Sequence, residues 1–140
     1  MRTDQPYCWV EKWQHTNSVL RVIETLKSGT ILKEIADWLN TPTYVPDIVK
    51  STAKLIQINE TGIFHLTGPD FINRYDLAIL TAEIFCLKKE MIQPINSKEL
   101  GLAAKRSNVK LNNEKTCKKT GILFLGIKDG LIDMQRNFLL

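Results

Sequence analysis

The three tyrosines of the chain are the first side chains to test for catalytic chemistry. A tyrosine with a lysine four residues later is a proton donor, because the ammonium lowers the pKa of the phenol. The residues at that spacing are Glu11, Ile48 and Ile79, after Tyr7, Tyr44 and Tyr75 respectively. No tyrosine therefore has the lysine that this acid/base pair requires, and we expect no catalytic residue in the chain.

The sequence contains neither a recognisable cofactor loop nor a metal motif. Its seven glycines never give the spacing G-x-G-x-x-G or G-x-x-x-x-G-K, with which backbone amides reach a phosphate. His15 and His65 are fifty residues apart, too far to form a local ligand pair. The cysteines are odd in number and lack a C-x-x-C pair, so we expect reduced thiols, mostly in the core. We therefore predict no cofactor-binding or metal-ligating residue.

The composition is that of one globular domain. The 140 residues are 44% apolar and 24% charged. No apolar run approaches the roughly 20 residues that cross a bilayer, and the N-terminal region has no apolar stretch of signal-peptide length. These features exclude a transmembrane span and predict a cytoplasmic protein without a membrane partner.

Positive charge is concentrated in one segment. Of the net charge of +4, residues 98–119 contribute a local +5, from seven basic and two acidic side chains. Such a cluster can attract a nucleic acid or a phosphorylated ligand. More often it is only a solvated face, and charge alone does not separate these interpretations.

Four segments have apolar residues at helical spacing. They cover residues 17–27, 47–56, 74–87 and 127–138. Asn17 or Ser18 can cap the first helix, and Gly29 can end it. Asp47 is expected to cap the second helix, whose buried face would comprise Val49, Thr52, Ala53 and Ile56. The third is apolar on most of its circumference, so we expect it to lie between other elements.

Short strand-like segments separate these helices. Residues 62–68 place five strand-forming residues between two glycines, and residues 91–95 suggest another strand. Residues 31–38 fit a strand or a helix equally well. Residues 98–121 are polar and weakly periodic, which indicates a short helix and irregular chain. Strands alternating with helices predict an α/β fold.

Five short motifs follow one another in an order that resembles a known family. They are Arg2-Thr3, the stretch from Asp37 through Thr41-Pro42-Thr43 to Asp47-Ile48, residues 62–68, Arg74-Tyr75, and Ala104-x-Arg106 with Leu111. Together they resemble the C-terminal half of dTDP-4-dehydrorhamnose reductase, a family of extended short-chain dehydrogenase/reductases. The resemblance covers essentially the whole chain.

The resemblance implies the C-terminal part of an extended short-chain dehydrogenase/reductase fold, a substrate-binding lobe with the last Rossmann elements. The family uses NADPH to reduce the 4-keto group of dTDP-6-deoxy-L-lyxo-4-hexulose, giving dTDP-L-rhamnose. Its glycine loop and catalytic Tyr-x-x-x-Lys lie in the N-terminal half. Residues 1–140 would then be a single substrate-binding-type domain that lacks the dinucleotide-binding half, and no cofactor is expected to bind this chain alone.

The resemblance also implies substrate-binding residues. In the family an aromatic residue shortly after the Arg-Thr pair approaches the sugar nucleotide. Gln5 stands in register with it, and Tyr7 and Trp9 lie just beyond. The family's Ala-x-Arg-Pro motif places Arg106 where its planar fork would suit a diphosphate, with Ser107 in place of the proline.

The implied partners are a dTDP-sugar substrate and an N-terminal Rossmann half or partner chain. Neither a nucleic acid nor a membrane is an expected partner. A different function class stays open: a non-catalytic regulatory protein like the β subunit of methionine adenosyltransferase, which shares this fold and binds another enzyme.

Overall fold

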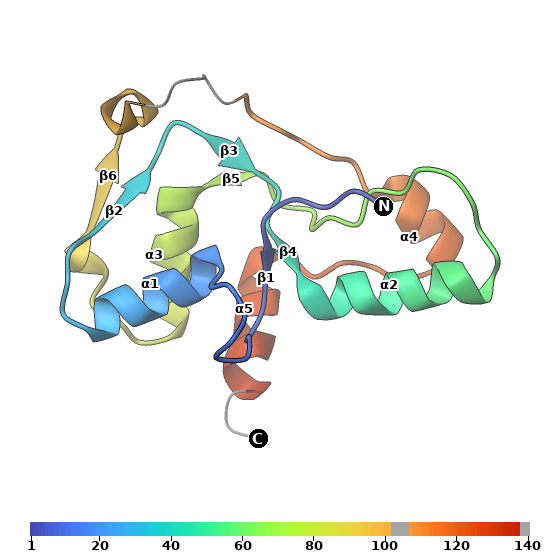
Figure 1. Ribbon diagram of the computed structural model, residues 1–140, viewed down its shortest axis with the longest axis horizontal. Coiled ribbons are helices and arrows are strands. Elements are labelled where there is room, and N and C mark those ends of the chain that lie inside the picture. Colours follow the sequence, from blue (N-terminus) through green and yellow to red (C-terminus); the bar gives the residue numbers. More distant parts are fainter. Residues whose placement is uncertain (102–106, 138–140) are drawn as a thin grey trace.

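The computed structural model describes residues 1–101 and 107–137, which form a mixed α/β structure (Figure 1). Its longer helices are α1 (Ser18–Lys27), α2 (Val45–Gln57), α3 (Arg74–Ile84), α4 (Glu114–Thr120) and α5 (Ile127–Arg136). The 3-10 helices η1 (Lys89–Met91) and η2 (Ser97–Leu100) flank the last strand. No helix within the described ranges combines the length and apolar character that a membrane span needs.

The strands are short and pair two by two within the described residues. β1 (Pro6–Tyr7) runs parallel to β4 (Thr43–Tyr44), and β2 (Leu32–Ile35) runs parallel to β6 (Ile92–Ile95). β3 (Leu39–Asn40) is antiparallel to β5 (Ile72–Asn73). The strand predicted near residue 91 is therefore confirmed as β6, and the ambiguous segment after residue 31 contains a strand.

The strand predicted over residues 62–68 is present only as an extended segment. It makes one parallel bridge, between Arg2 and His65. The Arg2 amide donates to the Phe64 carbonyl over 2.9 Å, and the Leu66 amide donates to the Arg2 carbonyl over 2.8 Å. Phe64 and Leu66 are buried on one side, as the alternation predicts, while Ile63 is exposed.

Three helices, α1, α3 and α5, form where periodicity places them. The Asn17 side chain caps α1 by accepting the amides of Val19 and Leu20, both over 3.1 Å, and Gly29 follows the helix with φ +75°. α3 packs against α1, α5, β2 and β6, so the prediction that it lies between other elements is confirmed (Figure 1). The predicted closing helix is α5, whose Ile127, Leu131 and Met134 are buried; Phe138 lies outside the described residues.

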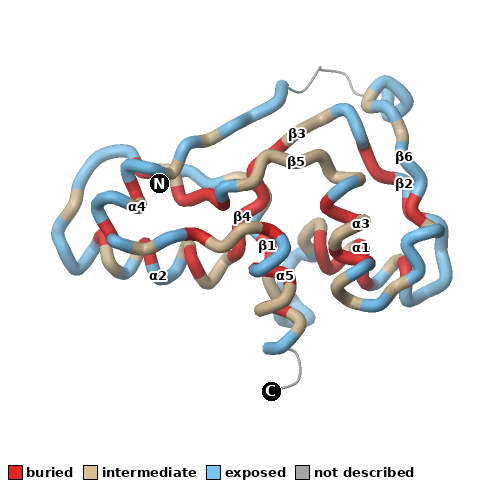
Figure 2. The backbone as a smooth tube through the Cα atoms, turned by 180° about the vertical axis from the view of Figure 1, so that it is seen from behind, coloured by how far each residue is buried: buried red, intermediate tan, exposed pale blue. Residues whose placement is uncertain are grey.

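The cap and buried face predicted for α2 are wrong. The helix begins at Val45 after Tyr44, and no side chain caps it. Asp47 is buried and accepts the backbone amide of Leu125 over 2.8 Å. The predicted face points outward, with Val49 60% and Ile56 71% exposed. Figure 2 shows α2 alternating between buried and exposed stretches.

The expectation that the cysteines lie mostly in the core is also wrong. Cys8 and Cys117 are only half-buried, and Cys86 is exposed. The apolar pattern of α3 extends through Leu87, but the helix itself ends at Ile84. Cys86 follows with φ +54°, in the turn beyond the helix. All three thiols are free, as predicted.

The centre of the fold is a contact between two tyrosines and a helix glycine. Tyr7 is 1% exposed, its ring lies 5.6 Å from that of Tyr44, and burial raises its pKa. The Tyr44 hydroxyl donates to Asp133 on α5 over 2.8 Å. A Cβ atom on Gly130 would overlap the Tyr7 hydroxyl and lie 3.3 Å from the Tyr44 Cβ. Only glycine lets α5 approach the tyrosines this closely.

Substituting Gly130→Ala should therefore lower the free energy of unfolding by about 1–3 kcal/mol, the usual cost of overpacking. The Tyr7 hydroxyl is buried without a hydrogen-bond partner, so adding Tyr7→Phe should recover part of this loss. Urea denaturation measures both effects, with Lys128→Ala on the exposed side of α5 as the control. If Gly130→Ala were as stable as Lys128→Ala, the close contact would be refuted.

Candidate functional site

A cleft of about 560 Å³ opens where three helices begin. Ser18, Val45 and Arg74 all line it, and they are the first residues of α1, α2 and α3 respectively. The N-terminal segment forms another wall. Because the N-terminal end of a helix carries partial positive charge, this convergence favours an anionic ligand.

The cleft contains two of the four residues that the sequence predicts for substrate binding. Gln5 and Trp9 both line it. Tyr7 lies between them in the sequence but is buried in the core, and it does not line the cleft. Arg106 lies outside the described residues. Within the described ranges, the predicted set is thus divided between the cleft and the core.

A buried polar network fixes the backbone that carries Gln5. The Asp4 carboxylate accepts the Thr41 amide over 2.9 Å, and the Gln5 carbonyl accepts the Thr43 amide over 3.2 Å. The Thr43 hydroxyl in turn accepts the Gly68 amide over 3.2 Å. A Cβ on Gly68 would lie 2.5 Å from the Pro42 carbonyl oxygen, so the close approach requires glycine.

Gln5 itself adopts an unusual backbone conformation. Its φ of +39° lies in the left-handed region, which costs about 1 kcal/mol or more for a residue with a side chain. The neighbouring hydrogen bonds hold it there. Such strain often accompanies a functional position, and Gln5 lines the cleft.

Trp9 and Asn17 connect the N-terminal segment to the helices. The Trp9 indole N–H donates to the Met134 carbonyl over 2.7 Å, and its ring packs edge-on against Phe85, with centroids 6.0 Å apart. The Asn17 amide donates to the Cys8 carbonyl over 2.7 Å. The Trp9 ring at the cleft wall is therefore held in place by contacts with α5 and with Phe85.

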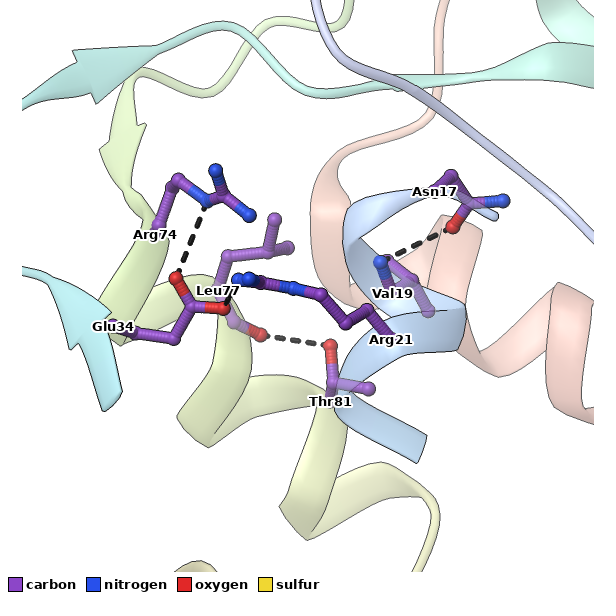
Figure 3. Close-up of polar contacts among 7 residues, drawn as sticks. All are labelled: Asn17, Val19, Arg21, Glu34, Arg74, Leu77 and Thr81. Carbon is purple, nitrogen blue, oxygen red and sulfur yellow. Dashed lines mark hydrogen bonds and ion pairs between the residues drawn. The ribbon is translucent and has the colours of Figure 1, made fainter. Parts of the chain in front are cut away.

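Arg74 belongs to a charged cluster at the edge of the cleft (Figure 3). Glu34 on β2 is 2% exposed and lies between two arginines. One of its oxygens binds Arg21, and the other lies 3.3 Å from Nε of Arg74. Burial lowers the pKa of Arg21, and the charge of Arg74 lowers it further. Two guanidinium groups and one carboxylate leave a net charge of +1 in the cluster.

The cleft has the chemistry of an anion and ring binder. Among its described lining residues, Arg74 and His15 can carry positive charge and none is acidic. The flat face of Trp9 suits a base or a sugar ring. Nowhere in the described ranges do three His, Cys, Asp or Glu side chains gather as a metal site would require.

Sequence reasoning missed His15 and Asn17 as cleft residues and recognised Arg74 only as part of a motif. Arg74 follows the N-cap Asn73, whose side chain accepts the Asp76 amide over 2.7 Å. An arginine at the first position of a helix is a usable signal, because its side chain stands beside the positive helix end. The partner Glu34, forty residues earlier, has no local signal.

In the basic segment, residues 98–119, four lysines of the described part contact other residues of the same chain. Lys115 donates to the Ile63 carbonyl over 3.0 Å and lies 4.2 Å above the Phe64 ring. Lys118 pairs with Glu114, Lys119 pairs with Glu60, and Lys110 lies over the Phe71 ring. None of these four lysines lines the cleft. Their contacts support a structural role for the segment.

The left-handed backbone conformation of Gln5 should make the free energy of unfolding depend on the residue at this position. Gln5→Gly should raise the free energy of unfolding by about 1 kcal/mol, because glycine adopts this φ without steric cost. Gln5→Val should lower it, since a β-branched side chain fits the left-handed region poorly. Urea denaturation of both variants measures the difference. Equal stability of the two would mean that the conformation is not strained.

No curated protein sequence matches the chain. Solved structures do match. dTDP-4-dehydrorhamnose reductase from Bacillus anthracis, in complex with NADP, aligns with a TM-score of 0.81 and 23% identity, over 97% of this chain and 47% of that one. The ortholog from Clostridium acetobutylicum aligns with a TM-score of 0.81 and 22% identity, over 99% and 48%.

A dTDP-glucose 4,6-dehydratase from Bacillus anthracis, in complex with NAD, aligns with a TM-score of 0.76 and 12% identity, over 99% of this chain and 43% of that one. The chain thus spans about half the length of the enzymes it resembles. These matches confirm the predicted fold, the C-terminal part of an extended short-chain dehydrogenase/reductase.

The sequence-based resemblance is confirmed at the level of the family. The model of the RmlD substrate binding domain matches residues 7–138. The matched range includes Tyr7 of β1, the lining residues of the cleft from Cys8 onward, and every helix described above. The chain belongs to the RmlD substrate-binding domain family.

Proposed function

We propose that the chain is the substrate-binding portion of a sugar-nucleotide oxidoreductase of the dTDP-4-dehydrorhamnose reductase type, and that it is inactive alone. The cleft carries this proposal, because it brings Gln5, Trp9 and Arg74 together at three helix starts. A diphosphate suits the positive charge, and a base or sugar ring suits Trp9. The family match supports this ligand class.

The chemistry of reduction would need a second component. The family's reductases use NADPH as the hydride donor, yet this sequence has neither a glycine loop nor a Tyr-x-x-x-Lys pair. We therefore propose that residues 1–140 act as one substrate-binding domain with a dinucleotide-binding half that supplies both. The role of the described residues is to bind and orient the sugar nucleotide.

An open sheet edge and an apolar surface support such a partner. A parallel sheet is normally covered on both faces and consists of several strands, whereas the parallel pairing of Arg2 with His65 is a single bridge. Val49 and Ile56 on α2 are exposed, as is Leu123. Met1 reaches α2, where its sulfur accepts the Thr52 hydroxyl over 3.3 Å. We propose that the parallel strands of a dinucleotide-binding half cover this region.

Calorimetric titration tests the ligand class. The isolated chain should bind dTDP-L-rhamnose but not NADPH, and it should not reduce the 4-keto sugar when given both substrates. Trp9→Leu should weaken sugar-nucleotide binding about tenfold, the scale of one lost ring contact. Trp13→Leu is the matched control, since Trp13 is 83% exposed outside the cleft. Tight NADPH binding or turnover by the chain alone would contradict the proposal.

Association with a separate dinucleotide-binding half tests the partner. The N-terminal half of the Bacillus anthracis reductase, supplied as its own chain, should bind the wild-type protein in sedimentation experiments. Ile56→Glu should weaken this binding about tenfold or more, because it buries a charge in an apolar interface. Ile31→Glu should not, since the exposed Ile31 precedes β2, at the opposite end from α2 (Figure 1). Failure of the wild type to bind, or equal binding by Ile56→Glu, would count against this surface.

A further inference from the structure

We propose that Arg74 binds the diphosphate of the ligand and that buried Glu34 positions it for this task. The inference rests on the proposed function of the cleft and assigns its anion-binding residue. Arg74 is the first residue of α3 and lines the cleft. A guanidinium at this position adds a full charge to the partial charge of the helix start.

The ion pair with Glu34 is made by the inner nitrogen of the Arg74 guanidinium. Glu34 contacts the inner nitrogen, with Nε of Arg74 3.3 Å from its Oε2. Figure 3 shows the two terminal nitrogens of Arg74 pointing away from the Glu34 carboxylate. The planar fork that pairs with phosphate oxygens is formed by such nitrogens. Glu34 therefore holds the base of the guanidinium through this ion pair.

Glu34 is much more deeply buried than the two arginines that it contacts. Its side chain is 3% exposed, compared with 23% for Arg74 and 41% for Arg21. A buried carboxylate is costly without a partner, so Glu34 keeps both arginines close. Because two positively charged arginines, Arg21 and Arg74, pair with the single Glu34 carboxylate, the cluster keeps a net positive charge. With no acidic side chain among the described lining residues, an anion in the cleft meets attraction without a competing carboxylate.

Removing the Glu34 charge separates positioning from simple attraction. If the cluster acted only through its summed charge, Glu34→Gln would make the cleft more positive and tighten anion binding. If Glu34 positions Arg74, the same substitution releases the guanidinium and weakens anion binding. The two roles therefore predict changes of opposite sign.

The experiment is calorimetric titration of the 140-residue chain with thymidine 5′-diphosphate, inorganic pyrophosphate and thymidine. Arg74→Gln should weaken binding of the diphosphate and of pyrophosphate about tenfold or more, as expected for lost charged hydrogen bonds. Its affinity for thymidine should stay within about twofold. Arg74→Lys keeps the charge but loses the fork, so it should recover little of the loss.

Glu34→Gln should weaken diphosphate binding about fivefold, with thermal denaturation confirming that the variant is folded. Lys33→Gln is the matched control, because Lys33 is the exposed neighbour on β2 and points to the opposite face of the strand. It should change affinity by less than about twofold. If Glu34→Gln does not fold, the comparison of Arg74→Lys with Arg74→Gln decides the question.

Three outcomes overturn the inference. They are diphosphate binding by Arg74→Gln at wild-type affinity, tighter binding by Glu34→Gln, and full retention of affinity in Arg74→Lys. In each of these cases a wild-type chain that binds the diphosphate leaves the proposed function standing. A wild-type chain that binds neither thymidine 5′-diphosphate nor dTDP-L-rhamnose overturns both.

Discussion

The parallel register of β1 and β4, with the buried hydrogen bonds around it, is the constraint on which this molecule depends. Pro6 lies opposite Thr43 and Tyr7 opposite Tyr44, and Asp4 and Thr43 satisfy the polar groups that the pairing buries. Because buried polar groups must find partners, the register cannot slip without leaving several unpaired. This junction joins the N-terminal segment to the start of α2 and thereby forms one side of the cleft.

The parts that local sequence could predict are those whose stabilising contacts lie nearby in the chain. The α1 cap uses Asn17 and the amides of Val19 and Leu20, which lie two and three residues later. α3 is apolar on nearly all sides, so its burial follows from composition. In α2 the apolar row faces outward, and the buried residues Asp47, Ser51 and Leu55 are mostly polar, so periodicity selects the wrong face. The buried face depends on Asp47 and the Leu125 amide, 78 residues apart, a contact that no local pattern contains.

The candidate site shows the same division. Gln5 and Trp9 were predicted through a family resemblance, and both line the cleft. Tyr7 was predicted for the same reason, but strand alternation turns its side chain into the core. The pairing of Arg74 with Glu34 depends on β2 and α3 packing together. The local sequence therefore identifies Arg74 as an arginine at a helix start, but it does not identify Glu34 as its partner.

The convergence of three helix starts has a further consequence. Ser18, Val45 and Arg74 place the partial positive charges of α1, α2 and α3 around one cleft, and like charges repel one another. Under the function proposed above, an anion bound there would lower this repulsion and so stabilise the contacts between elements from distant parts of the chain.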